Sequence, residues 1–189
     1  MRIRDADDVK YVLPLIEGQV LISTPHTSSG ALVRGLREKD LKSLKAISNN
    51  IRFGTLDGFD GQPGLALGSR MANDLNVKVG DEVSLLTPRG PSTALGTAPR
   101  VKRYPVVAIF EIGMSEYDAS ILFMPLKEAQ LYFSVPDSVT VLEVVLNSPD
   151  EVGELAPKII TAGGPTIYVS DWRQRNATFF TALQVERNV

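Results

Sequence analysis

The sequence predicts an α+β fold rich in β-hairpins, and two observations carry this prediction. Most apolar segments are short, rich in Val, Ile and Leu, and bounded by Gly, Pro or Asn, which is typical of strands. A smaller number of segments space their apolar residues as an amphipathic helix does. With 189 residues, of which 43% are apolar and 22% are charged, the chain can bury a core in one large domain or two small ones.

The first predicted hairpin lies near the N-terminus. Val9–Ser23 is rich in residues that favour strands, but Pro14 and Gly18 interrupt it. Because proline lacks the backbone N–H that an interior strand needs, we expect an edge strand with a bulge or bend. A turn cluster follows, and Ala31–Gly35 returns as the second strand of the hairpin.

Two short helices and a loop precede the next hairpin. Asp40–Ile47 has apolar residues at positions 41, 44 and 47 and therefore predicts an amphipathic helix. Asn49–Pro63 contains several glycines and an Asn-Asn pair, so it predicts a loop that crosses between domains. Gly68–Leu75 predicts a second short helix, and the tight turn Asn76–Asp81 leads into a strand at Glu82–Leu86.

The connection Pro88–Arg103 is the most informative segment of the chain. It holds cations and no acid, although the formal net charge of the chain is −2. The cations are Arg89, Arg100, Lys102 and Arg103. Because Tyr104–Phe110 after it is again strand-like, we expect a long hairpin arm whose positive rim suits a negative partner.

Composition alone leaves two interpretations of this arm equally open. Lys and Arg commonly decorate exposed hairpins, where they keep the protein soluble or protect a sheet edge. Three features favour a function: the connection is long for a hairpin, prolines stiffen it, and apolar residues lie beside the charges as candidate anchors. These residues are Pro88, Pro91, Pro99, Leu95 and Val101.

Five elements are predicted between the arm and residue 146. Tyr104–Ile112 is a strand, and Gly113–Asp118 is a turn. Ala119–Met124 is a further strand, and Leu126–Phe133 has the pattern of a helix. Val139–Leu146 alternates loosely and is rich in valine, which favours a strand.

The C-terminal region predicts two helices and one strand. Ser148 has the position of an N-cap for a helix that runs to about Ala162 and is kinked or shortened at Pro157. Thr166–Val169 predicts a strand. Trp172–Glu186 predicts a last helix with no capping signal at its end, so we expect this helix to continue into a following segment.

The chain offers few residues for covalent chemistry or metal binding. It has no cysteine, which excludes disulfides, thiolate metal sites and a cysteine nucleophile. Its single histidine, His26, has no Gly-x-Ser-x-Gly elbow to pair with, and we expect a solvated turn residue. Neither a calcium loop nor a glycine-rich phosphate loop is present. We therefore expect no catalytic residue, no metal site and no cofactor, and we find no apolar run long enough to span a bilayer.

Four strings of the sequence together resemble one family of transport proteins. They are Ile16–Gln19, Gly64–Pro88, Val106–Gln130 and Asp171–Val189. They resemble the periplasmic domain of the LolC/LolE family, the membrane subunits of the lipoprotein-releasing ABC transporter. More broadly, they resemble the MacB-like ectodomain of the FtsX-like permeases. The resemblance covers nearly the whole chain.

The resemblance implies a discontinuous architecture. A porter-like α/β subdomain would take its halves from residues 1–50, where the first half is expected to be truncated, and 138–189. A β-rich, sabre-like subdomain at 51–137 would be inserted between them, with crossings at Asn49–Pro63 and Ser134–Ser138. The long hairpin, called the Hook in this family, would correspond to residues 88–103. The C-terminal end would lead toward a transmembrane helix.

The resemblance also implies a function and a set of partners. The domain would belong to an inner-membrane permease of a Gram-negative bacterium that releases lipoproteins and passes them to the periplasmic chaperone LolA. Its partners would be a LolA-like chaperone, a second permease subunit, a LolD-like ATPase and the lipoprotein cargo, with no enzymatic role for the domain. The residues expected to contact the chaperone are Arg89, Pro99, Arg100, Val101, Lys102 and Arg103.

Two other functions remain open. The first is a MacB-like or FtsX-like ectodomain that engages an adaptor or a cell-wall hydrolase. The second is a cytosolic domain that binds nucleic acid or an acidic protein through the basic arm. Because the arm lacks interleaved aromatic residues for base stacking, apart from Tyr104, we expect no nucleic-acid partner.

Overall fold

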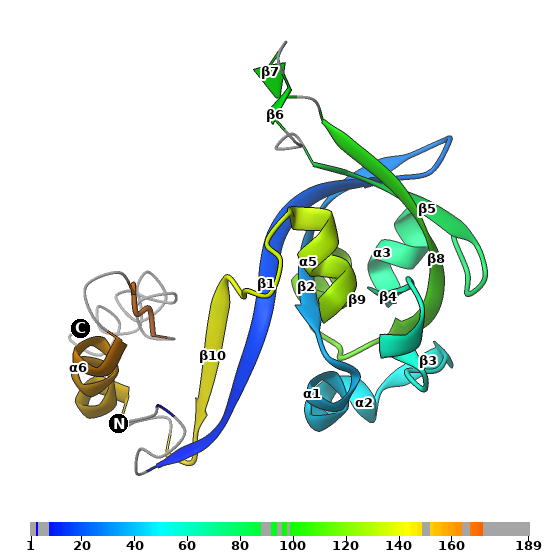
Figure 1. Cartoon of the computed structure of the whole chain (residues 1–189). Helices are drawn as coiled ribbons and strands as arrows, with labels where there is room; N and C mark the ends of the chain where they lie inside the picture. The colour runs from blue at the N-terminus through cyan, green and yellow to red at the C-terminus, as the bar shows by residue number, and fades with distance from the viewer. Residues whose placement is uncertain are drawn as a thin grey trace, which may run out of the picture. The chain divides into compact units, whose positions relative to one another are not determined.

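A computed structural model of the chain describes residues 3, 8–87, 92–93, 96–97, 99–148, 152–163 and 167–171. The chain divides into two compact units, which are described separately. The larger unit is Leu13–Leu142, and the smaller unit combines Met1–Val12 with Glu143–Val189. The predicted α+β class is confirmed, because strands and short helices alternate along the chain without a regular βαβ order (Figure 1).

The strands and helices have the following bounds. The strands are β1 Val9–Ser23, β2 Ser28–Leu36, β3 Ile51–Gly54, β4 Leu65–Gly68, β5 Glu82–Thr87, β6 Ser92–Thr93, β7 Gly96–Thr97, β8 Arg100–Phe110, β9 Ile121–Pro125 and β10 Val141–Leu146. The helices are α1 Glu38–Ser43, α2 Lys45–Ser48, α3 Ser69–Asp74, α4 Ser115–Ser120, α5 Leu126–Phe133 and α6 Val152–Gly163, with a 3-10 turn at Phe59–Gly61.

Strand pairings in the larger unit close into a ring. The order is β1, β2, β9, β4, β8, β5 and back to β1. The long strand β8 makes this closure possible, because its first half pairs with β5 and its second half pairs with β4. Only β2–β9 and β4–β8 are parallel pairs within this ring. β3 adds to β8 outside the ring, and β10 pairs with β1.

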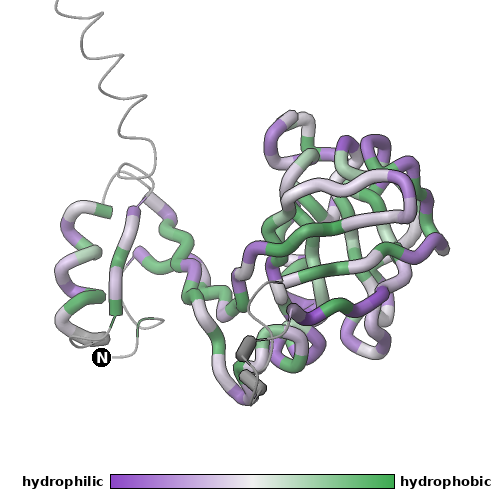
Figure 2. The backbone as a smooth tube through the Cα atoms, turned by 90° about the horizontal axis from the view of Figure 1, so that it is seen from above, coloured by the Kyte–Doolittle hydropathy of each residue, from purple (hydrophilic) through white to green (hydrophobic). Residues whose placement is uncertain are grey.

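The main hydrophobic cluster lies between these strands and two helices. Met71 of α3 and Tyr132 of α5 belong to it, together with Tyr104 of β8, which is fully buried. Figure 2 shows hydrophobic segments along the strands of the larger unit and hydrophilic segments at their connecting turns. Burial of these side chains stabilises the unit by about 25 cal/mol per Å² of apolar surface and is the main driving force for its folding.

The predicted edge position of β1 is wrong for its second half. Ile16–Ser23 pairs with β2 in continuous register, and Leu21–Ser23 also pairs with β5 on the other edge. Gly18 therefore does not mark a bulge in this ladder. A Cβ at this position would lie 2.4 Å from the ring of Phe133. The absence of a side chain at Gly18 therefore lets this ring of α5 pack directly against the strand.

Several other predicted elements differ from the structure near their ends. The helix predicted at Asp40–Ile47 is two short helices, α1 and α2, divided at Leu44. The predicted loop Asn49–Pro63 contains strand β3. Strand β4 carries no alternation because all of its residues are buried, and its apolar run was not recognised as a strand.

Two further differences lie toward the C-terminus. The predicted turn Gly113–Asp118 ends in helix α4, and the strand after it begins at Ile121 instead of Ala119. Asp118 organises this region, because its buried carboxylate accepts the backbone N–H groups of Ile112 and Gly113, both at 3.0 Å. No strand forms at 167–169, and the predicted last helix at Trp172–Glu186 lies outside the described residues.

The borders of the two compact units fall within strands. They lie between Val12 and Leu13 in β1 and between Leu142 and Glu143 in β10. The sequence placed its crossings at 50/51 and 137/138 instead. The division into a porter-like and a sabre-like subdomain at those positions stays a prediction.

Candidate partner-binding arm

The basic segment forms the expected hairpin in its described part, but its second strand begins at Arg100 instead of Tyr104, so Arg100–Arg103 belong to the strand and not to the connection. β5 and β8 pair from Glu82 opposite Pro105 to Thr87 opposite Arg100. Farther along, Ser92 pairs with Thr97 in the short ladder of β6 and β7. Figure 1 shows this pair of strands extending beyond the ring of the larger unit. We call the segment from β5 to β8 the arm; Arg89, one of the predicted contact residues, lies outside the described residues.

The predicted contact residues on β8 face two sides of the strand. Successive side chains of a strand point in opposite directions, so Arg100 and Lys102 share one face and Val101 and Arg103 share the other. The first face turns toward helix α5, as the contacts of Arg100 and Lys102 show. We call this the inner face of the arm and the opposite one the outer face.

Arg100 binds the C-terminal end of α5. Its Nη1 donates to the backbone oxygen of Leu131 at 2.7 Å and to that of Tyr132, and its Nη2 donates to Oγ of Ser134 at 3.0 Å. The last carbonyls of a helix have no partner within the helix and carry partial negative charge. The guanidinium group of Arg100 donates hydrogen bonds to these carbonyls, and its charge is opposite to theirs. Arg100 of β8 therefore caps the C-terminal end of α5.

Lys102 and Tyr104 bind the first turn of the same helix. Lys102 Nζ and the Tyr104 hydroxyl both donate to Oε1 of Glu128, each at 2.7 Å. Lys102 Nζ also lies 5.1 Å from the centre of the Tyr104 ring, within the range of a cation–π contact. Burial, and then the hydrogen bond to Glu128, raise the pKa of Tyr104 well above its ordinary value.

Tyr132 completes the packing between the arm and α5. Its ring meets that of Tyr104 edge-on, with 6.0 Å between centroids and 67° between planes. Within the described part of the chain its buried hydroxyl has no hydrogen-bond partner. Burial raises the pKa of Tyr132 to about 12.

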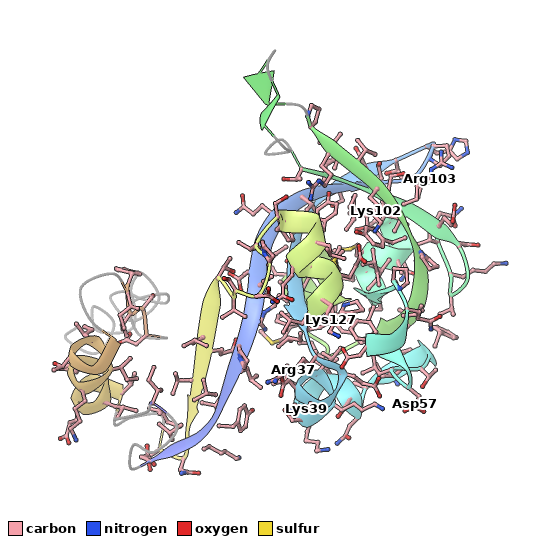
Figure 3. The ribbon with its side chains drawn as sticks, viewed as in Figure 1. Arg37, Lys39, Asp57, Lys102, Arg103 and Lys127 are labelled. Carbon is pink, nitrogen blue, oxygen red and sulfur yellow. The ribbon has the colours of Figure 1, made fainter. Side chains whose placement is uncertain are left out.

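The outer face combines aliphatic surface with a free cation. Leu21, Leu86 and Val101 lie side by side across β1, β5 and β8. Leu21 is 40% exposed and Val101 is 58% exposed, which is high for such side chains on a sheet. Arg103 follows on the same face and is exposed; of the described residues, none forms an ion pair with it (Figure 3).

The single histidine lies in a turn, as the sequence predicts. His26 is exposed in a turn where the Thr24 hydroxyl accepts the backbone N–H of His26 and Thr27. Within the described ranges, no group of three or more His, Cys, Asp or Glu side chains could hold a metal ion. The described helices include none that is long and apolar enough to cross a membrane.

Sequence reasoning recognised the cations of the arm but missed the groups that bind them. Glu128 and Ser134 were not predicted to take part, because nothing in the sequence says which helix packs beside the arm. The pattern on β8 contained one usable signal. Arg100, Lys102 and Tyr104 occupy every second position, which predicts one shared face.

Comparisons with known sequences identify relatives of the chain. No protein-family model matches the chain. The sequence is 29% identical over 178 residues to the lipoprotein-releasing system transmembrane protein LolC of Xylella fastidiosa (strain Temecula1), covering 93% of this chain and 42% of the relative. It is 23% identical over 189 residues to the corresponding LolE protein of Haemophilus influenzae, covering 100% of this chain and 45% of the relative.

A solved structure has the same overall fold. The periplasmic region of MacB from Actinobacillus actinomycetemcomitans matches with a TM-score of 0.56 at 12% identity, covering 94% of this chain and 78% of that one. At this identity the likeness shows the fold alone. The chain spans less than half the length of the curated relatives it matches. Together these matches confirm the resemblance inferred from the sequence.

Proposed function

Because the chain is related to the LolC/LolE family over almost its whole length, we propose that it is the periplasmic domain of an inner-membrane ABC transporter permease. The permease releases lipoproteins from the inner membrane of a Gram-negative bacterium and passes them to a LolA-like chaperone for sorting to the outer membrane. A LolD-like subunit hydrolyses ATP, and a second permease subunit of the LolC or LolE type completes the transporter. The domain itself carries no catalysis.

The projecting arm is the observation that carries this proposal. A chaperone handover needs a surface that reaches away from the body of the domain, and the hairpin of β5 and β8 continues into such an extension at β6 and β7 (Figure 1). Its outer face offers exposed aliphatic side chains beside a cation without an intramolecular ion pair among the described residues. An apolar patch beside an arginine is compatible with a protein partner, because the buried centre of an interface is apolar and arginine is enriched in interfaces.

On this proposal the residues of the arm contribute in different ways. Val101 and Arg103 of the outer face contact the chaperone directly, with Arg103 binding a carboxylate through its planar guanidinium group. Pro99 is exposed at the base of the arm and limits its flexibility. Arg89 belongs to the same predicted set.

Copurification and lipoprotein sorting test this function together. The 189-residue chain, tagged and exposed to a periplasmic extract of its own organism, should retain the LolA-like chaperone. Depletion of the full-length permease should leave outer-membrane lipoproteins in the inner membrane. Normal sorting under depletion would reject the proposal. Retention of an adaptor protein or a cell-wall hydrolase in place of the chaperone would instead support a MacB-like or FtsX-like ectodomain.

A further inference from the structure

The inner face of the arm is joined to α5 at both ends of that helix. Arg100 binds the last turn through Leu131, Tyr132 and Ser134. Lys102 and Tyr104 bind Glu128 in the first turn. The contacts run in opposite order along the strand and the helix. Two separated attachments hold the inner face of β8 to the helix at two points, in addition to the pairing of this strand with β5 and β4.

Helix α5 is itself a firm base for these attachments. A Cβ on Gly35 of β2 would lie 2.3 Å from the Cβ of Ala129, and a Cβ on Gly18 of β1 would lie 2.4 Å from the Phe133 ring. Both glycines thus let the helix lie directly on the backbone of the sheet. Ala129 is fully buried as a result. Helix α5 therefore belongs to the packed core of the larger unit, and its contacts with the arm join the arm to that core.

The energies of the contacts suggest a graded attachment. The Lys102 side chain is 47% exposed and that of Glu128 is 13% exposed, so water screens the ion pair and we expect a small net contribution. Arg100 makes charge-assisted bonds to two helix carbonyls and should contribute more. We expect the domain to remain folded when either contact is lost.

We propose that Arg100, Lys102 and Glu128 are positioning residues: they hold the base of the arm against α5 and so set the direction in which its outer face meets the partner. This inference rests on the proposed chaperone-binding function and assigns these two cations a role different from direct contact. The outer-face residues Val101 and Arg103 then account for the contact itself.

A charge swap separates positioning from contact. Lys102→Glu and Glu128→Lys are made singly and together in the 189-residue chain, and the affinity for the purified LolA-like chaperone is measured. Each single variant should weaken binding about 3- to 10-fold. The double variant should restore part of the affinity, because the ion pair is rebuilt with reversed polarity while the Tyr104 hydroxyl still lacks its acceptor. If Lys102 contacts the chaperone, the double variant stays as weak as Lys102→Glu, and the inference is overturned.

A distance measurement tests the inference without the chaperone. The chain has no cysteine, so Thr97→Cys on the arm and Lys39→Cys on α1 give two specific sites for spin labels. Arg100→Gln should broaden the distance distribution between the labels, and Arg100→Lys should restore it in part. An unchanged distribution in Arg100→Gln would refute positioning. A wild-type chain that shows a narrow distribution but does not bind the chaperone would refute the proposed function and leave the positioning role standing.

Discussion

Arg100 and Arg103 stand on the same strand but act on opposite sides of it: the guanidinium group of Arg100 binds the end of α5, and that of Arg103 is exposed on the outer face. The sequence does not distinguish these two cations, but the fold gives them different surroundings. A cation held by helix carbonyls contributes to the stability of the larger unit, whereas an exposed one is available to a partner.

This difference predicts unequal effects of two matched substitutions. Arg100→Ala should lower the free energy of unfolding by about 1–2 kcal/mol, because carbonyls at the end of α5 lose a charged donor. Arg103→Ala should change it by less than about 0.5 kcal/mol, as is usual for exposed positions. Urea unfolding of both variants, followed by circular dichroism, measures the difference. Equal losses would mean that the contacts of Arg100 do not stabilise the unit.

The two tyrosines between the arm and α5 provide a second matched pair. Tyr104→Phe removes the hydroxyl that donates to Glu128, and should destabilise the larger unit by about 1 kcal/mol. Tyr132→Phe removes a buried hydroxyl that has no partner within the described part of the chain, and should be neutral or stabilising. Thermal unfolding at pH 7 compares them. A Tyr132→Phe variant that loses as much stability as Tyr104→Phe would contradict this prediction.

The raised pKa of Tyr132 predicts a loss of stability in alkaline solution. An unfolded tyrosine loses its proton near pH 10, whereas folded Tyr132 keeps it to about pH 12. Through this group the free energy of unfolding is therefore constant below about pH 10 and falls as the pH rises from 10 toward 12, by up to about 2–3 kcal/mol. Urea midpoints at pH 8, 10 and 11.5 measure the decline. Tyr132→Phe should decline less than wild type, which controls for the other groups that titrate there.

Close packing at Gly68 predicts a strong effect from a single methyl group. A Cβ at Gly68 would lie 2.2 Å from the backbone oxygen of Asp118, and backbone cannot move aside as a flexible side chain can. Gly68→Ala should therefore destabilise the larger unit by about 2–3 kcal/mol. Gly30→Ala on β2 is the control, because nothing lies within 4 Å of its added Cβ. If both variants unfold at the same urea concentration, the packing of β4 against α4 is not as described.

The sequence predicted the elements whose pattern is local. Helix α5 lies where expected, and both strands of the hairpin arm were recognised, although β8 begins at Arg100 instead of Tyr104. β4 was missed because a strand buried on both faces carries no alternation. Gly18 was interpreted as a sign of a bulge or bend. A glycine is needed there because the ring of Phe133, far away in the chain, packs against it.

The candidate site shows the same limit. The sequence identified the cations of the arm by their charge and by the strands around them. It could not tell the cations that bind α5 from the cation that is exposed, because this depends on which face of β8 packs on α5. That contact joins residues about 30 positions apart, and no local pattern records it.

Binding of the LolA-like chaperone to an outer-face variant decides whether Arg103 contacts the partner. Wild type, Arg103→Glu and the stability-matched control Arg103→Gln are titrated with the chaperone by calorimetry, with unfolding measured in parallel. We expect Arg103→Glu to weaken binding at least about tenfold, or about 1.4 kcal/mol, with unchanged unfolding. Arg103→Gln should show a smaller loss. Undiminished affinity in Arg103→Glu would contradict the assignment of the outer face as the surface that meets the chaperone.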